Sequence, residues 1–229
     1  MNIAKMTINE LEAHFNQEWN KNEFRGTVTQ LSKLEKGISL VKSKFEMFNF
    51  DAIVSFVCKP EQPSSVDGIY FSNGNIYLVE FKTGFSQKIK KGRADFDEEK
   101  AKCPHINSIC EDYWKQFTDR QKKEIKNLHD SLKLKALETY LFLEKKIGFI
   151  KNKSDSGKVI LAIVTDENGI DGMESSLSEL AGDNGSKSRV YNSLRRFKNQ
   201  KDINENIYCY DEINVYSAEG FSSIINKLM

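Results

Sequence analysis

The distribution of apolar and polar residues along the chain predicts alternating helices and strands. Apolar residues recur at helical spacing over residues 10–19, 27–48, 129–146, 188–200 and 218–229. Short apolar runs bounded by turn residues predict strands over residues 50–57, 66–71, 75–83, 159–167 and 206–217. Because helices and strands are interspersed, we expect an α/β fold with a mixed central β-sheet flanked by helices on both faces.

Residues 85–127 interrupt this pattern. A basic stretch, KIKKGR, leads into an acidic one, DFDEEK, and then into a weakly periodic segment. We interpret these residues as a helical insertion within a single domain that spans residues 1–229. The continuous apolar run VILAIVT, which follows the buried helix 129–146, is typical of a central strand.

Composition and charge leave the class of protein open. The 229 residues are 39% hydrophobic, which is enough for a sizeable core. The net charge of +1 arises from 34 basic and 33 acidic residues, so no overall field favours nucleic acid or a membrane. The chain has neither an apolar run of about 18 residues nor a secretory leader. We therefore expect a cytoplasmic, intracellular protein without membrane contact.

The stretch VDGIYFSNGNIYLVEFKTG, residues 66–84, predicts a hairpin that carries two acids. Asn73-Gly74 favours a two-residue type I′ turn, because both central positions of that turn need a positive φ. Counting outward from the turn pairs Ser72 with Asn75 and, at the far end, Asp67 with Glu80. Directly opposed residues share one face of a sheet, with Cβ atoms about 5 Å apart. The two carboxylates should therefore point into the same space.

Two carboxylates this close are destabilising unless one is protonated or a cation lies between them. Magnesium binds one or two carboxylates together with waters and phosphate oxygens. Asp67, Glu80 and the backbone carbonyl of Phe81 could supply one side of such a sphere. Lys82, on the same face, could hold a water and stabilise negative charge on a phosphorane-like transition state. The alternative is a surface ion-pair cluster in which Lys82 neutralises Glu80.

Asp67 followed by Glu80-Phe81-Lys82 on the next strand resembles the PD-(D/E)xK phosphodiesterase superfamily, which includes many restriction endonucleases. The core of that superfamily runs helix, three strands, helix, strand, and residues 27–167 match this order. Val66 stands where the proline of the motif's name would be. The resemblance implies a restriction-endonuclease-like core, with Asp67 and Glu80 as ligands of Mg²⁺ or Mn²⁺ and Lys82 as the catalytic lysine.

The resemblance also suggests further site residues. Many members add an acid from the first core helix, and Glu35 is the candidate, with a solvated glutamate as the alternative. A polar residue on the helix after the third strand is also common. Lys133, which borders the face of Leu134, Leu137 and Leu141, is the candidate there, and a snorkelling surface lysine is the alternative. Viral RNA endonucleases of the superfamily use an N-terminal histidine, for which His14 is available.

Basic residues could contact nucleic-acid phosphates near this site. The candidates are Lys88, Lys90, Lys91, Arg93, Arg195 and Arg196. A solvated charged surface explains each cluster almost equally well.

The sequence thus predicts a metal-dependent nuclease that hydrolyses phosphodiester bonds, with DNA favoured over RNA. A homodimer is expected if both strands of a duplex are cut. The alternatives are an inactive module of the same fold that binds nucleic acid or a protein, and a viral-type RNA endonuclease.

Overall fold

The computed structural model describes residues 6–33, 37–82, 102, 110–151, 156–166 and 209–229, with some side chains of residues 110–129 left aside. In this part of the chain, six strands form one mixed sheet in the order β1-β2-β3-β4-β5-β6. The strands are β1 Arg25–Thr27, β2 Glu46–Asn49, β3 Gly68–Ser72, β4 Asn75–Lys82, β5 Val159–Thr165 and β6 Glu212–Ser217. Strands β1 to β4 pair antiparallel, whereas β4, β5 and β6 are parallel. The expected mixed α/β sheet is confirmed.

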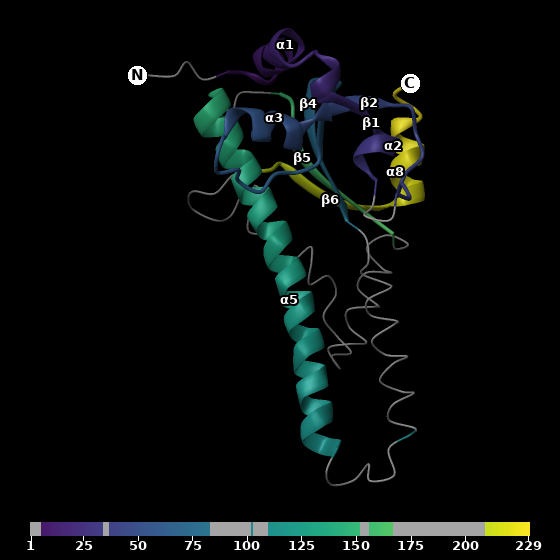
Figure 1. Ribbon diagram of the computed structural model, residues 1–229. Helices are drawn as coiled ribbons and strands as arrows, with labels where there is room; N and C mark the ends of the chain where they lie inside the picture. Colours follow the sequence, from purple (N-terminus) through teal and green to yellow (C-terminus); the bar gives the residue numbers. More distant parts are fainter. Residues whose placement is uncertain (1–5, 34–36, 83–101, 103–109, 152–155, 167–208) are drawn as a thin grey trace.

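Helices cover both faces of the sheet, and each face has its own hydrophobic core (Figure 1). The helices are α1 Ile8–Glu18, α2 Val28–Leu31, α3 Phe50–Val57, α5 Cys110–Phe142 and α8 Ala218–Ile225. Phe15 of α1, Ile53 of α3 and Ala136 of α5 pack against one face. Val28 of α2 and Phe221 of α8 pack against the other.

The predicted central strand is confirmed. β5 lies between β4 and β6, and every residue from Val159 to Thr165 is buried. A strand covered on both faces needs apolar side chains at consecutive positions, which explains why its sequence shows no alternation. No helix in the described ranges is long and apolar enough to cross a membrane.

The hairpin is also confirmed. Asn73 and Gly74 have φ values of 51° and 70°, as a type I′ turn requires. The predicted register holds from Ser72–Asn75 to Gly68–Val79. The ladder ends there, one pair before Asp67 and Glu80, and the carbonyl of Asp67 accepts a hydrogen bond from the N–H of Phe50 instead.

The helix predicted over residues 27–48 is wrong. These residues contain the end of β1, the short helix α2 and most of the strand β2. Ile38, an apolar residue within this range, is 65% exposed. Hydrogen bonds of Ser32 and Ser43 help to explain why the helix does not continue. Ser32 Oγ donates to the Val41 carbonyl and accepts from the Val41 N–H. The N–H of Ser43 donates to Thr29 Oγ1. Such side-chain bonds offer the backbone an alternative to a helix.

The strand predicted over residues 50–57 is wrong as well, because these residues form α3. Asn49 caps the helix by accepting a hydrogen bond from the N–H of Ala52, and the buried Phe50, Ile53 and Val54 follow helical spacing. A short apolar run fits a strand or a buried helix equally well by periodicity. The N-cap asparagine was the signal that favoured the helix.

The helix predicted over residues 129–146 exists but begins much earlier. α5 starts at Cys110 and is continued by the π-helical turn η2, Leu143–Ile147, which ends at Gly148 with φ 88°. The end of the proposed insertion, residues 110–127, therefore belongs to this helix. Most of the rest of the insertion lies outside the described residues. Figure 1 shows that the C-terminal part of α5 covers the sheet and its N-terminal part extends beyond it.

Candidate functional site

Asp67 lies just before β3, and its side chain turns toward the end of β4. Its Oδ2 accepts a hydrogen bond of 2.6 Å from the backbone N–H of Phe81. One carboxylate oxygen is thus held by β4, next to the position of Glu80. The structure keeps the two acids together although the backbone ladder ends at Gly68.

Glu80 is the most deeply buried charged side chain of the site, with 2% of it exposed. It points to the same face as Ile76 and Leu78, which is the face covered by α5. Lys82 follows two residues later on that face, and its Nζ lies 3.8 Å from Glu80 Oε1. The E-x-K spacing therefore places acid and lysine side by side, as the sequence predicted.

Lys135 of α5 completes the cluster. Its Nζ lies 2.8 Å from Glu80 Oε2 and 3.6 Å from Asp67 Oδ1. Each acid thus directs one oxygen at the ammonium of Lys135. The other oxygen of Asp67 accepts the Phe81 N–H, and the other oxygen of Glu80 faces Lys82. The ammonium of Lys135 balances part of the charge of the carboxylate pair.

Burial and charge repulsion dominate the protonation of the pair. Burial, helped by the charge of Asp67, raises the pKa of Glu80 to about 8, although Lys135 opposes the rise. Burial also raises the pKa of Asp67, against the opposing effects of Lys135 and the Phe81 N–H. Burial disfavours the charge of Lys135, but Glu80 and Asp67 outweigh it and raise the pKa of that ammonium. The site therefore keeps Lys135 charged and resists full ionisation of both acids.

Three side chains hold the loop that leads into Asp67. The N–H of Ser64 donates to Glu138 Oε2 at 2.5 Å, and the N–H of Val66 donates to Thr139 Oγ1 at 3.0 Å. Ser65 Oγ donates to Asp51 Oδ1 at the start of α3. Helices α3 and α5 together therefore fix the approach of the chain to Asp67.

The donor set fits magnesium or manganese. Asp67 Oδ1 and Glu80 Oε2 face a common point, and hard carboxylate oxygens are the ligands Mg²⁺ prefers. The N–H and C=O of a strand residue point to the same edge, so the carbonyl of Phe81 is on the side of Asp67. Within the described ranges no group of three or more His, Cys, Asp or Glu side chains could hold a metal ion. Water or substrate oxygens would have to complete the sphere.

The structure brings only part of the predicted site together. Lys133 forms an ion pair of 3.0 Å with Asp130 of its own helix rather than with the acids. The predicted face was the wrong one, because Leu134 is 46% exposed and Leu141 is also exposed. The buried stripe of α5 instead runs through Leu132, Ala136 and Thr139 and continues to Leu143 of η2.

Lys135, Asp51 and Thr139 were missed by the sequence reasoning. Lys135 lies three residues after Leu132 and four before Thr139, so helical spacing places it on the buried stripe. A lysine on such a stripe was the available signal. It could be read only once the correct face of the helix was known.

The other predicted site residues are not joined to the carboxylates. His14 of α1 has a ring contact with its neighbour Phe15, and no described contact links it to Asp67 or Glu80. The remaining candidates lie outside the described residues, namely Glu35, Lys88, Lys90, Lys91, Arg93, Arg195 and Arg196.

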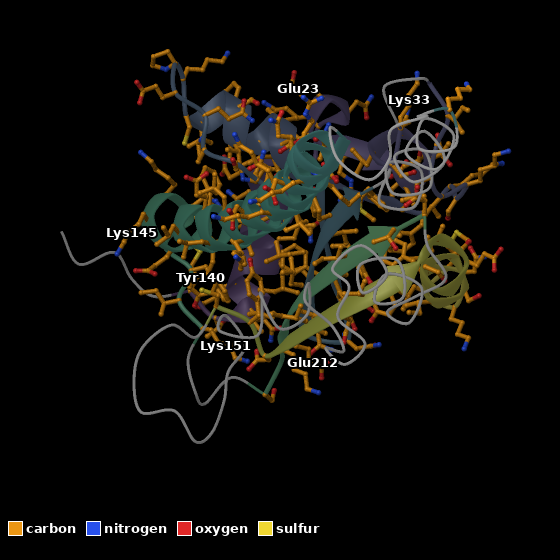
Figure 2. All side chains as sticks on the ribbon, turned by 90° about the horizontal axis from the view of Figure 1, so that it is seen from below. Glu23, Lys33, Tyr140, Lys145, Lys151 and Glu212 are labelled. Carbon is orange, nitrogen blue, oxygen red and sulfur yellow. The ribbon has the colours of Figure 1, made fainter. Side chains whose placement is uncertain are left out.

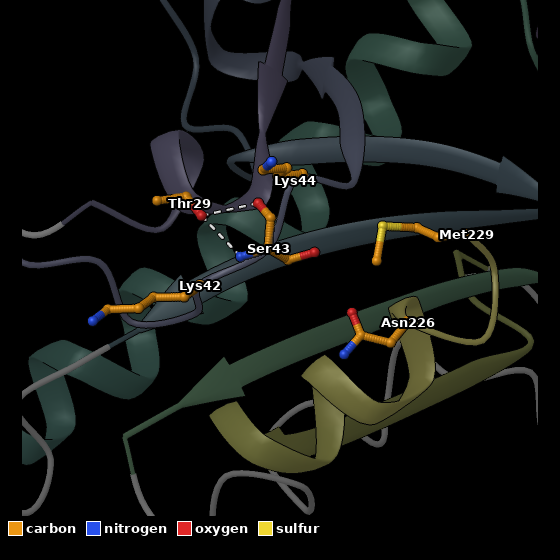
Figure 3. Close-up of a pocket in the computed structure, with 6 residues that line it drawn as sticks. All are labelled: Thr29, Lys42, Ser43, Lys44, Asn226 and Met229. Carbon is orange, nitrogen blue, oxygen red and sulfur yellow. Dashed lines mark hydrogen bonds between the residues drawn. The ribbon is translucent and has the colours of Figure 1, made fainter.

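A pocket of about 430 Å³ lies on the other face of the sheet (Figure 3). It is lined by Thr29, Lys42, Ser43, Lys44, Asn226 and Met229. Thr29 and Ser43 are hydrogen-bonded to each other, because the N–H of Ser43 donates to Thr29 Oγ1 and that hydroxyl donates to the Ser43 carbonyl. The pocket is lined by neither Asp67 nor Glu80 and is separate from the carboxylate site.

Comparisons with protein-family models, with curated proteins and with solved structures found no match for this chain. The likeness to the PD-(D/E)xK superfamily therefore depends on the motif and on the arrangement of the residues that carry it.

Proposed function

We propose that this protein is a metal-dependent nuclease that hydrolyses phosphodiester bonds, with DNA favoured over RNA as substrate. One observation carries the proposal: Asp67 and Glu80 converge at the end of a hairpin with Lys82 Nζ 3.8 Å from Glu80. Buried acid pairs are costly, and clusters of perturbed carboxylates are typical of functional sites.

A restriction-endonuclease-like core is part of the proposal. The elements α1, β2, β3, β4, α5 and β5 follow the order helix, three strands, helix, strand, with β1, α2 and α3 as additions. The elements that fill this order differ from those expected, because residues 27–48 do not form the first core helix and residues 50–57 form α3 rather than the first strand. The order itself supports the resemblance.

The chain's own residues suit hydrolysis of a phosphodiester. When bound, Mg²⁺ or Mn²⁺ acts as a Lewis acid that activates water and neutralises charge on phosphate oxygens. Asp67 and Glu80 would hold the metal, with the Phe81 carbonyl as a further oxygen ligand. Lys82 is partly exposed, so its ammonium can reach a substrate phosphate and stabilise the charge that develops there.

The test is a cleavage assay with labelled single-stranded, duplex and branched DNA and RNA. Each substrate is incubated with Mg²⁺, Mn²⁺ or a chelator, beside the Asp67→Asn and Lys82→Ala variants. We expect cleavage by the unaltered protein only with metal, and its loss in both variants. Cleavage that survives both substitutions would exclude this site as the catalytic centre.

A second candidate is a module of the same fold that binds nucleic acid or a protein without turnover. The contact of Lys135 with both acids favours it, because this ammonium supplies counter-charge without a metal. Binding of nucleic acid without cleavage of any substrate would support this candidate. The viral-type RNA endonuclease gains no support from the described contacts of His14.

A further inference from the structure

Asp67 and Glu80 each divide their oxygens between two tasks. Asp67 Oδ2 accepts the Phe81 N–H at 2.6 Å, which leaves Oδ1 directed toward Lys135 at 3.6 Å. Glu80 Oε1 is 3.8 Å from Lys82 Nζ, which leaves Oε2 to accept from Lys135 at 2.8 Å. The two oxygens that face a common point are therefore the two that contact Lys135.

The backbone beneath Lys135 is held firmly in place. The next residue, Ala136, is buried, and its carbonyl accepts a hydrogen bond of 2.5 Å from the hydroxyl of Tyr210. Thr139, one turn further along α5, is bound to the loop before Asp67 through the Val66 N–H. The same face of α5 thus positions both the lysine and the loop that carries one of its partners.

We propose that Lys135 is a resident counter-cation that competes with the divalent metal for Asp67 and Glu80. This inference rests on the proposed function, since it concerns the same carboxylates. A metal bound to Asp67 Oδ1 and Glu80 Oε2 needs the oxygens that Lys135 uses, so the two cations exclude each other there. Lys135 stabilises the metal-free site and lowers its affinity for metal.

An ordinary structural ion pair predicts a different outcome from this competition. If Lys135 only stabilises the fold, its removal weakens the protein and metal cannot restore what is lost. If it competes with metal, its removal weakens the metal-free protein but strengthens metal binding. The two effects then have opposite signs in one variant.

The experiment measures Mn²⁺ affinity by calorimetry, and thermal stability with Mn²⁺ or with a chelator. The test variant is Lys135→Gln, and the matched control is Lys133→Gln, which removes a lysine that pairs with Asp130 on the same helix. We expect Lys135→Gln to bind Mn²⁺ at least about tenfold more tightly than the unaltered protein, because a competing unit charge is gone. Its melting temperature should fall in chelator and rise more on addition of Mn²⁺.

Equal or weaker Mn²⁺ affinity in Lys135→Gln would overturn the proposal. If that variant does not fold in chelator, recovery of its native circular dichroism spectrum on addition of Mn²⁺ supports the competition, and failure to recover refutes it. Lys135→Arg, which keeps the charge, should bind Mn²⁺ much as the unaltered protein does. If Lys135→Arg bound Mn²⁺ as tightly as Lys135→Gln is expected to, the proposal would also be overturned.

The cleavage assay separates this inference from the proposed function. Cleavage by the unaltered protein without tighter Mn²⁺ binding in Lys135→Gln rejects the counter-cation alone. Tighter binding in that variant, with no cleavage of any nucleic acid by the unaltered protein, rejects the nuclease alone. If neither protein binds Mn²⁺, both proposals fail.

Discussion

At the end of the sheet where β4 finishes, Glu80 is 2% exposed and shares the ammonium of Lys135 with Asp67. At the opposite end, where β5 and β6 begin, Lys158 pairs with Glu212 at 2.6 Å, and these side chains are 54% and 36% exposed. Both ends contain lysines and acids close together. The Lys158–Glu212 pair is more exposed than the cluster of Asp67, Glu80 and Lys135, and its lysine contacts one acid rather than two.

The exposed pair of Lys158 and Glu212 needs no function to explain it, and the neighbouring pair of Lys151 and Asp211, 3.2 Å apart, joins one lysine to one acid. Water solvates Lys158 and Glu212 and screens their attraction, so such pairs contribute little to stability. Figure 2 shows Glu212 on the same side of the molecule as Tyr140 and Lys151, where α5 ends and β6 begins. At the buried end Glu80 is removed from water and Asp67 is 20% exposed, and this desolvation of acids costs free energy. The contrast is a physical reason to place function at the end of β4.

The largest expected effect is on cleavage, in a matched pair of substitutions at the two ends. We expect Glu80→Gln to lower kcat/KM by about 100-fold or more. The proposed metal would lose a carboxylate ligand, and with it the stabilisation of negative charge on the phosphate oxygens. Glu212→Gln should leave kcat/KM within about twofold, since its pair is exposed. Steady-state assays with Mg²⁺ measure both. Similar losses in the two variants would remove the functional distinction between the ends.

The next effect tests the loop that holds Asp67. Thr139→Val keeps the shape of a fully buried side chain but leaves the N–H of Val66 without its partner. We expect the free energy of unfolding to fall by about 1–3 kcal/mol, measured by denaturant titration. Thr139→Ser keeps the hydroxyl and should lose less. Equal losses in valine and serine variants would show that the hydroxyl does not hold the loop.

The pH dependence of stability should also differ between the two ends. The pKa of Glu80 is raised to about 8 in the folded protein, so the folded state binds this proton more tightly than the unfolded state. Stability of the protein in chelator should therefore fall as the pH rises from the ordinary glutamate pKa toward about 8. The raised pKa of Asp67 acts in the same direction.

Thermal melts in chelator across this pH range measure the effect. Glu80→Gln should flatten the decline, because the titrating group at the buried end is gone. Glu212→Gln should retain the full slope. An unchanged slope in Glu80→Gln would assign the pH dependence to other groups.

The smallest effect is expected for the exposed pair. Lys158→Ala should leave the free energy of unfolding nearly unchanged, because Lys158 and Glu212 are solvated. The measurement is a denaturant titration at low and at high salt, and the small difference from the unaltered protein should shrink with salt. A larger loss would mean that burial is not what distinguishes the two ends.

Local signals in the sequence determined the hairpin and its register as far as Gly68–Val79, which brings Asp67 close to Glu80. Asn73-Gly74 satisfies the positive φ values of its turn within two residues, and the side-chain period of two then fixes which acids share a face. The continuous apolar run of β5 likewise predicted a central strand, which the structure places between β4 and β6. These features depend on neighbours in the chain, so they can be predicted without the fold.

Only the tertiary structure decided which residues complete the site. Residues 50–57 form α3 because Phe50, Ile53 and Val54 pack on the sheet, although the same run could have been a strand. The choice of Lys135 over Lys133 depended on which stripe of α5 faces the sheet, and α5 carries apolar residues on more than one side. Packing against distant strands makes that choice, and local periodicity cannot supply it.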